Sequence, residues 1–183
     1  MISAKFFTPY SSLPKGIVFP KQTHSNNIKL IERGDEDLDD CDGIITDNIK
    51  LKLGILTADC ASLVFIEKER FALVHAGWRG LLSGIIENTL EFFKDPEVFV
   101  MPFSHIFEIQ KDNCYLQIQR RFGDDFFINN RNRVYFDFHS AIKSIVPSAQ
   151  FDPRNTYLDK SLASYRRDNS KDRNVTIVGN LEF

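Results

Sequence analysis

The chain has 183 residues, of which 43% are hydrophobic and 26% are charged, a balance typical of a globular protein with one domain. Its formal net charge of −2 gives no overall field that would recruit nucleic acid or an anionic membrane. Its three cysteines favour a reducing compartment over a disulfide framework, and no run approaches the roughly 20 apolar residues of a membrane span. We therefore expect a single cytoplasmic domain over residues 1–183, with no nucleic-acid or membrane partner.

The first half of the chain predicts mainly strands. In chain order, the patterns indicate a solvated acidic loop at 31–43, apolar strands at 43–47 and 51–58 separated by a turn, and a hairpin of strands 61–67 and 71–76. Apolar residues then recur at helical spacing, which predicts a helix over 81–94, opened by Gly80 and closed near Asp95 and Pro96.

The second half alternates strands with helices. The patterns predict a strand at the start of 97–109, a helix over 113–127, a strand running into a helix over 134–146, and a polar loop from 161 leading to a terminal strand at 175–179. Strands joined by short turns imply antiparallel pairing. We therefore expect an α+β layered sandwich with mixed sheets.

A hairpin of 61–67 and 71–76 brings two reactive side chains together. Its turn lies at 68–70, so Cys60 and His75 lie at the opposite end, on adjacent strands whose Cβ atoms are about 4.5–5.5 Å apart. Thiolate and imidazole can then share one metal ion or one proton. His24, in the segment KQTHSNN, could complete a set of ligands, although its position depends on the fold.

Two histidines and one cysteine are a recognised zinc set, and three protein ligands leave a fourth position for water or substrate. Zinc in such a site lowers the pKa of water to about 7, and thiolate with imidazole also suits copper. We expect Asp59, next to Cys60, to orient one of the imidazole rings.

Two further segments carry side chains suited to an anionic or aromatic ligand. In HAGWRG, Arg79 could hold phosphate or carboxylate and Trp78 could stack on a ring; in SYRRD, Tyr165, Arg166 and Arg167 could hold a phosphate or a purine. Each feature also has an ordinary explanation. Cys60 could be a small buried hydrophobe, His75 a hydrogen-bonded strand end, Trp78 a core residue, Arg79 a surface ion pair, and SYRRD a solvated loop.

The motifs KQTHSNNI, DGIITD, GILTADC, VHAGWRGLLSGII and SYRRD occur in the order found in the YfiH family, which the chain resembles. This family is also called the laccase-domain, polyphenol oxidase or peptidoglycan-editing-factor family. The convincing match covers about residues 21–92, and a weaker one covers 155–168.

The resemblance implies a four-layer α/β/β/α sandwich and a zinc site at His24, Cys60 and His75. It also implies phosphorolysis of adenosine, inosine, guanosine or methylthioadenosine, together with deamination of adenosine. Purine nucleoside and phosphate would then be the partners, with Arg79 as a catalytic or substrate contact and Asp59 as a second catalytic candidate. A separate role implied by the family is removal of wrongly incorporated residues from peptidoglycan precursors.

The chain departs from the family pattern in three places. It is shorter than usual, and only FFT at 6–8 hints at the family's SLNLG-like segment. The GPxIGPCCYEV stretch corresponds to 101–118, where Cys114 and Tyr115 are its remnant. The CT pair before SYRR is replaced by Asn155 and Thr156.

A multicopper oxidase is the least compatible function, because it needs many histidine ligands and this chain has four histidines. The leading hypothesis is a zinc-dependent purine nucleoside phosphorylase and adenosine deaminase. Three alternatives stay open: a peptidoglycan-precursor amidase with Cys60 as nucleophile, a single-copper polyphenol oxidase, and a metal-binding protein of weakened activity. The oligomeric state, including a homodimer, is also open.

Overall fold

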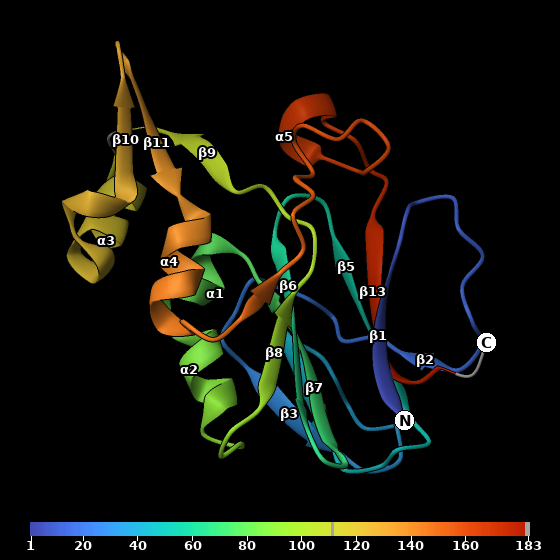
Figure 1. The fold of residues 1–183 in the computed structure, drawn as a ribbon. Helices are drawn as coiled ribbons and strands as arrows, with labels where there is room; N and C mark the ends of the chain where they lie inside the picture. Colours follow the sequence, from blue (N-terminus) through green and yellow to red (C-terminus); the bar gives the residue numbers. More distant parts are fainter. Residues whose placement is uncertain (111, 182–183) are drawn as a thin grey trace.

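The computed structural model describes residues 1–110 and 112–181. Residue 111, inside the altered 101–118 segment, and the last two residues of the expected 1–183 domain therefore lie outside the described residues. The strands of the described part form three sheets (Figure 1).

The largest sheet has six strands and runs through the centre of the molecule. Its order is β12 (Gln150–Phe151), β8 (Glu97–Val100), β6 (Ala61–Glu67), β7 (Arg70–Ala76), β4 (Gly43–Thr46) and β3 (Ile28–Ile31). Strands β3 and β4 pair in parallel, as do β12 and β8, while the central pairs are antiparallel. The predicted hairpin is confirmed as β6 and β7.

Two smaller sheets flank it. One has the strand order β1 (Ile2–Phe7), β13 (Asn174–Asn180), β5 (Lys52–Thr57) and β2 (Ile17–Val18). The other has the strand order β10 (Phe127–Asn130), β11 (Arg133–Asp137) and β9 (Ile106–Ile109). The predicted strands 43–47 and 51–58 are present as β4 and β5, but they belong to different sheets.

Alternation along β6 and β7 explains how the layers hold together. Leu63 and Phe65 lie in the cluster that packs against the helices, whereas Val64 lies in the cluster between the two larger sheets. All three are fully buried. Burying a side chain of this kind stabilises the fold by about 1.5–3 kcal/mol, so the six-stranded sheet is held from both faces.

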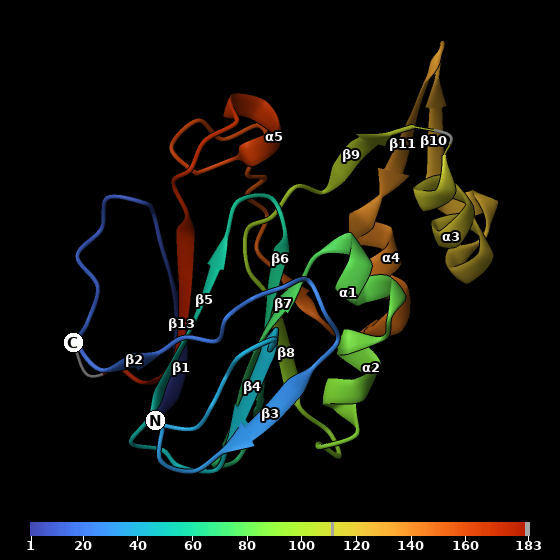
Figure 2. The ribbon, with the colours of Figure 1, turned by 180° about the vertical axis from the view of Figure 1, so that it is seen from behind.

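The helices lie mainly on one side of this central sheet (Figures 1 and 2). They are α1 (Trp78–Leu82), α2 (Ile85–Leu90), α3 (Asn113–Phe122), α4 (Phe138–Ile145) and α5 (Tyr165–Asp168). The mixed-sheet α+β class is confirmed. Ile17 of β2 packs against a small buried cluster formed by Phe7, Val175, Ile177 and Leu181.

The helix predicted over 81–94 is wrong in its bounds. It is two short helices, the first beginning at Trp78 and the second ending at Leu90. The break falls at Gly84, whose φ of 86° lies in the left-handed region that glycine adopts at little cost. Both helices bury apolar residues in the same cluster, so the apolar spacing looked continuous.

The remaining predictions of elements hold with shifted ends. The helix of 113–127 is α3 followed by a 3-10 turn at Asp124–Phe126, the strand and helix of 134–146 are β11 and α4, and the terminal strand is β13. The acidic 31–43 segment is a loop, although its residues 41 and 42 are fully buried. No helix among the described residues is both long and apolar enough to cross a membrane.

Candidate metal centre and cleft

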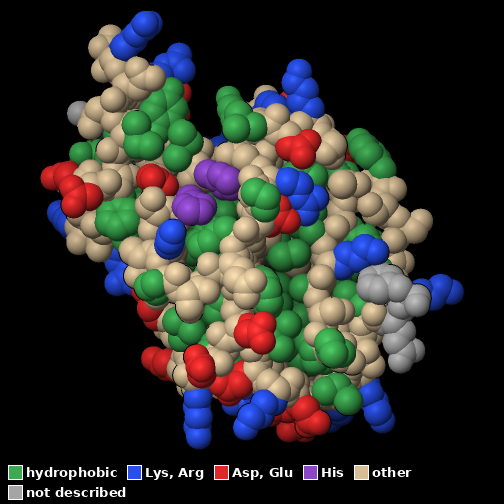
Figure 3. Space-filling model, in the orientation of Figure 1, with side chains coloured by type: hydrophobic (Ala, Val, Ile, Leu, Met, Phe, Trp, Pro, Cys, Tyr) green, Lys and Arg blue, Asp and Glu red, His purple; other side chains and the backbone are tan. Residues whose placement is uncertain are grey.

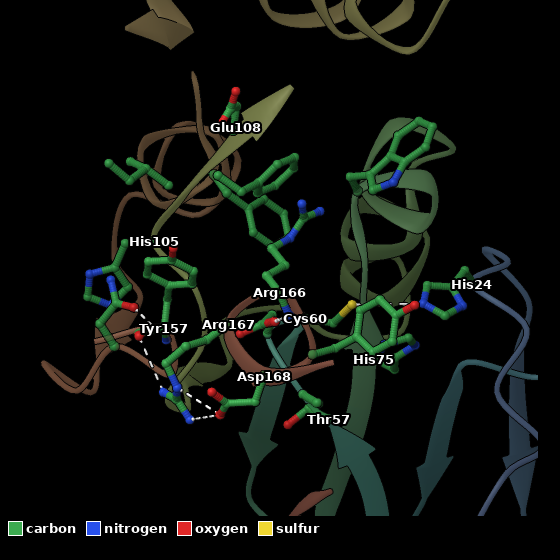
Figure 4. Close-up of a pocket in the computed structure, with 18 of the residues that line it drawn as sticks. His24, Thr57, Cys60, His75, His105, Glu108, Tyr157, Arg166, Arg167 and Asp168 are labelled. Carbon is green, nitrogen blue, oxygen red and sulfur yellow. Dashed lines mark hydrogen bonds and ion pairs between the residues drawn. The ribbon is translucent and has the colours of Figure 1, made fainter. Parts of the chain in front are cut away.

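Three segments of the chain bring His24, Cys60 and His75 together (Figure 4). His24 lies in the loop before β3, Cys60 directly precedes β6, and His75 pairs with Ser62 across the hairpin. The ligand atoms of the three side chains lie within 4.8 Å of one another, and Cys60 Sγ is 3.8 Å from His24 Nε2. His24 is exposed, Cys60 is half-buried and His75 is buried, so the cluster opens to solvent on one side.

A carboxylate that the sequence did not reveal, Asp42, organises this cluster. It is fully buried and accepts a hydrogen bond of 2.7 Å from His75 Nδ1. The same carboxylate accepts the backbone N–H groups of Thr23, His24 and Ser25 at 2.7–3.1 Å. Asp42 therefore fixes the ring of one candidate ligand and the loop that carries another. Its sequence signals are its place directly before the apolar strand β4 and its place as the first residue of the motif DGIITD.

The charges in the cluster are coupled. Burial alone would raise the pKa of the Cys60 thiol, but hydrogen bonds from His24 and His75 outweigh it and lower this pKa to about 6. Burial alone would lower the pKa of His75, yet its contacts with Asp42 and Cys60 raise this pKa to about 9. Burial likewise opposes ionisation of Asp42, but its hydrogen bonds, led by that from His75, hold its pKa well below the usual range. At neutral pH the metal-free cluster is thus a thiolate beside an imidazolium.

The glycines of HAGWRG are explained by the same geometry. A Cβ atom at Gly77 would lie 2.7 Å from Cδ2 of His24 and 3.3 Å from Sγ of Cys60. A Cβ atom at Gly80 would lie 2.8 Å from the backbone oxygen of Ser25. The loop that carries His24 therefore packs directly on the start of α1, at a distance that only glycine allows.

Asp59 does not orient an imidazole as expected, because Asp42 makes that contact. The Asp59 carboxylate instead accepts a hydrogen bond of 2.9 Å from the Thr156 hydroxyl and one of 2.7 Å from the backbone N–H of Arg166. It is 5% exposed, and its φ of 92° is unusual for a residue other than glycine. Asp59 thus connects the turn that carries Cys60 to α5.

The cluster lies on the wall of a cleft with a volume of about 1590 Å³. Figure 3 shows the surface notched between the part formed by β9–β11 with α3 and the part that carries α5. The lining is rich in rings, since Trp78, Phe107, Tyr135, Phe138, Tyr157 and Tyr165 all contribute. A cleft of this kind can hold a planar ligand beside the cluster.

Two guanidinium groups in this cleft have neither an acidic partner nor a hydrogen-bond acceptor among the described residues. The Arg79 guanidinium lies 4.5 Å from the ring centre of Trp78, and that of Arg166 lies 4.0 Å from the ring centre of Phe107. Stacking on a ring orients a guanidinium and leaves its N–H donors available. Both arginines line the main cleft and also an adjoining groove of about 520 Å³.

The other residues of SYRRD differ from each other in their surroundings. Tyr165 is 57% exposed at the cleft. Arg167 also lines the cleft, but its guanidinium donates to the backbone oxygens of Thr156, Asp159 and Leu162 at 2.6–3.0 Å. These contacts, with an ion pair to Asp168, tie the Arg167 guanidinium to the loop of residues 156–162.

One thiolate and two imidazoles fit zinc, and they also suit copper. Two observations support this fit. Asp42 bonds to Nδ1 of His75, which leaves Nε2 available to a metal, and the cluster is open on the side of the cleft. Among the described residues this is the single group of three or more such side chains close enough to share an ion.

Fold and site together define a class: an α+β protein with mixed sheets and a histidine–cysteine–histidine cluster of metal-binding type in a cleft. Within that class, the chain belongs to the family described as "Multi-copper polyphenol oxidoreductase laccase", whose sequence profile matches residues 5–179. The resemblance to the laccase-domain family is confirmed.

Several relatives carry the name purine nucleoside phosphorylase. One from Aquifex aeolicus is 32% identical over 174 residues, which cover 88% of this chain and 82% of the relative. Another from Borreliella burgdorferi is 27% identical over 179 residues, which cover 88% and 77%.

Solved structures show the same fold. The hypothetical protein YfiH of Bacillus licheniformis superposes with a TM-score of 0.79 at 21% identity, covering 90% of this chain and 74% of that one. YlmD of Geobacillus stearothermophilus superposes with a TM-score of 0.80 at 20% identity, covering 92% and 74%.

Proposed function

We propose that this protein is a zinc-dependent purine nucleoside phosphorylase that also deaminates adenosine. Adenosine, inosine, guanosine and methylthioadenosine are the proposed nucleosides, and phosphate is the second substrate. One observation carries the proposal: the metal-type cluster lines the same ring-rich cleft as two guanidinium groups that have neither an acidic partner nor a hydrogen-bond acceptor among the described residues. The relative from Aquifex aeolicus named purine nucleoside phosphorylase supports the choice of substrates.

His24, Cys60 and His75 would hold the metal, and the fourth coordination position would face the cleft. A zinc ion there supplies a Lewis acid at the reacting centre. Asp42 binds Nδ1 of the His75 ring, so that Nε2 would be free to bind the ion, and it fixes the backbone of the loop that carries His24.

Arg79 and Arg166 would bind phosphate. A guanidinium offers paired N–H donors that match two phosphate oxygens, and the two groups together balance most of the charge of the dianion. An oxygen of phosphate held there would bond to C1′ of the ribose as the bond from C1′ to the purine nitrogen breaks, and the leaving base would take a proton from solvent. The products are the free base and ribose 1-phosphate, or its 5-methylthio form from methylthioadenosine. Trp78, Phe107 and Tyr165 offer ring faces to the purine.

The test is an assay of the zinc-loaded protein with each nucleoside, with and without phosphate, followed by chromatography of the products. We expect base and ribose 1-phosphate only when phosphate is present, and inosine from adenosine when it is absent. Arg79→Ala should raise the KM for phosphate about tenfold or more, because a charge-assisted hydrogen bond contributes about 1.5–3 kcal/mol. Arg133→Ala is the matched control, since Arg133 lines the same cleft but is paired with Glu108.

No product from any nucleoside, with zinc bound, would refute the proposed activity and favour the alternative of a metal-binding protein with weakened turnover. A polyphenol oxidase with several coppers is not supported, because the described residues offer one such cluster and not several. Copper in place of zinc on the purified protein, with oxidation of a phenol, would support the single-copper alternative.

A second candidate is favoured by the charge state of Cys60. A thiolate beside an imidazolium is the arrangement of an activated cysteine nucleophile, so the metal-free chain could hydrolyse an amide of a peptidoglycan precursor. Alkylation by iodoacetamide separates the two candidates. The zinc enzyme predicts a Cys60 that is protected until a chelator is added, whereas the hydrolase predicts rapid alkylation of the protein as purified.

A further inference from the structure

The two oxygens of the Asp59 carboxylate each have one donor, and the donors come from two distant segments. Oδ1 accepts from the Thr156 hydroxyl at 2.9 Å, and Oδ2 accepts from the backbone N–H of Arg166 at 2.7 Å. Thr156 and Asp59 are almost completely buried. A buried carboxylate whose oxygens are both satisfied fixes the groups that it binds, because losing either contact leaves a polar atom without a partner.

The backbone of Asp59 makes a third connection. Its carbonyl oxygen accepts the N–H of Ser104 at 3.0 Å, and Ser104 leads directly into β9. Asp59 holds this conformation with a φ of 92°, in the left-handed region that favours glycine. Such a conformation persists only where the surrounding contacts over-determine it, which is what the three hydrogen bonds do.

Two of these connections, those to the backbone N–H of Arg166 and to Ser104, lead to the Arg166 side chain. Its backbone is held by Asp59, and its guanidinium lies over the ring of Phe107, which belongs to β9. Asp59 therefore anchors both the helix that carries Arg166 and the segment that carries the ring beneath it. Cys60 follows Asp59 directly in the chain, and Figure 4 shows Cys60 and Arg166 on neighbouring parts of the cleft wall.

We propose that Asp59 is a positioning residue that holds the Arg166 guanidinium at a fixed place relative to the metal ligand Cys60, and thereby sets the affinity of the cleft for phosphate. The inference rests on the proposed function only in taking phosphate as the anion. The two buried carboxylates then have separate roles. Asp42 positions the metal ligands, and Asp59 positions the guanidinium of Arg166.

Asp59→Gly and Asp59→Asn separate the contacts from the backbone conformation. Glycine removes the carboxylate and tolerates the φ of 92°, whereas alanine would add backbone strain. Asparagine can still accept the N–H of Arg166 through its oxygen and donate its amide to the Thr156 hydroxyl. The measurement is the Kd for inorganic phosphate, by titration calorimetry, on the zinc-loaded protein and on the metal-free protein.

We expect Asp59→Gly to weaken phosphate binding about 10-fold or more, Asp59→Asn to restore most of the affinity, and both variants to keep zinc at the level of the wild type. Arg166→Ala should show a similar loss. The double variant should bind phosphate no more weakly than Arg166→Ala alone, because Asp59 acts through Arg166. Asp42→Asn is the matched control, and it should lose zinc affinity about 10–100-fold while binding phosphate in its metal-free form like the wild type.

Three results would overturn the inference. They are a phosphate Kd for Asp59→Gly within twofold of the wild type, a double variant that binds phosphate more weakly than Arg166→Ala alone, and a loss of zinc from Asp59→Gly. Each can be obtained without any turnover of a nucleoside. If the protein cleaves no nucleoside but the phosphate affinities follow the expected order, the proposed function fails and the role of Asp59 stands. If nucleosides are cleaved but Asp59→Gly leaves the phosphate affinity unchanged, the proposed function stands and the role of Asp59 fails.

Discussion

At the scale of single residues, Asp42 orders the candidate metal ligands, because its carboxylate binds both the His75 ring and the loop that carries His24. The sequence places the candidate ligands better than it places this carboxylate. Cys60 and His75 could be placed together from a hairpin, since pairing across strands is a local rule. Asp42 could not be placed beside them, because it lies at the end of an acidic segment that resembles a solvated loop. Its burial depends on contacts with residues 17–33 positions away.

A similar limit applies to the adjacent arginines of SYRRD. Arg166 and Arg167 have the same chemistry, and a sequence cannot tell which guanidinium is held by backbone oxygens. The structure separates them because the guanidinium of Arg166 stacks on a ring at the cleft, while that of Arg167 donates to four backbone oxygens.

The close contact at Gly77 gives a direct prediction. Gly77→Ala would place a methyl group 2.7 Å from the His24 ring, so that the ring must move and zinc affinity should fall about 10–100-fold. Gly84→Ala is the matched control in the same segment. Its Cβ would meet nothing closer than 3.8 Å but would be strained at a φ of 86°, so it should lower Tm and leave zinc affinity unchanged. Equal zinc affinity in Gly77→Ala and the wild type would contradict this packing.

Proton competition gives a second prediction for the cluster. Zinc needs a neutral imidazole, and the pKa of His75 is raised to about 9, while Cys60, at about 6, is already a thiolate at neutral pH. Zinc binding should therefore displace about one proton, and its affinity should rise about tenfold per pH unit between pH 6.5 and 8.5. Competition with a chromophoric chelator measures this slope. An affinity that is flat over this range would show that His75 is already neutral in the free protein.

At the scale of elements, the sequence predicted the type of most strands and helices and missed what interrupts them. Gly84 breaks the predicted helix without disturbing its apolar spacing, because α1 and α2 present the same face to the core. The short α5 was read as loop, since four residues carry too little periodicity. Its start depends on the Ser164 side chain, which accepts the N–H of Arg167.

The loop of residues 156–162 gives a prediction at this scale. Arg167→Ala removes the N–H donors that bind the backbone oxygens of this loop. The change should destabilise the protein by about 1–3 kcal/mol and speed hydrogen exchange of the loop. Arg166→Ala is the matched control, because among the described residues its guanidinium has a ring contact but no hydrogen-bond acceptor. Exchange that is equally slow in both variants would contradict the bracing role of Arg167.

At the scale of the whole molecule, the α+β class followed from the order of elements, whereas the cleft did not. The cluster and the hairpin come from residues 21–92, where the resemblance was strong. The opposite wall comes from residues such as Phe107, Tyr135 and Phe138, in a part of the chain where the family pattern is altered. The shape of that wall depends on how β9–β11 pack against α3 and α4, which no local pattern encodes.

The fold brings two imidazoles and a thiolate close enough to share a single metal ion beside the cleft. The most direct test is the metal content of the purified protein and of Cys60→Ala, measured by mass spectrometry after dialysis against zinc. We expect about one zinc per chain in the wild type and almost none in the variant, with both proteins folded by circular dichroism. A wild type that retains no metal, or a Cys60→Ala variant that retains as much as the wild type, would contradict the account.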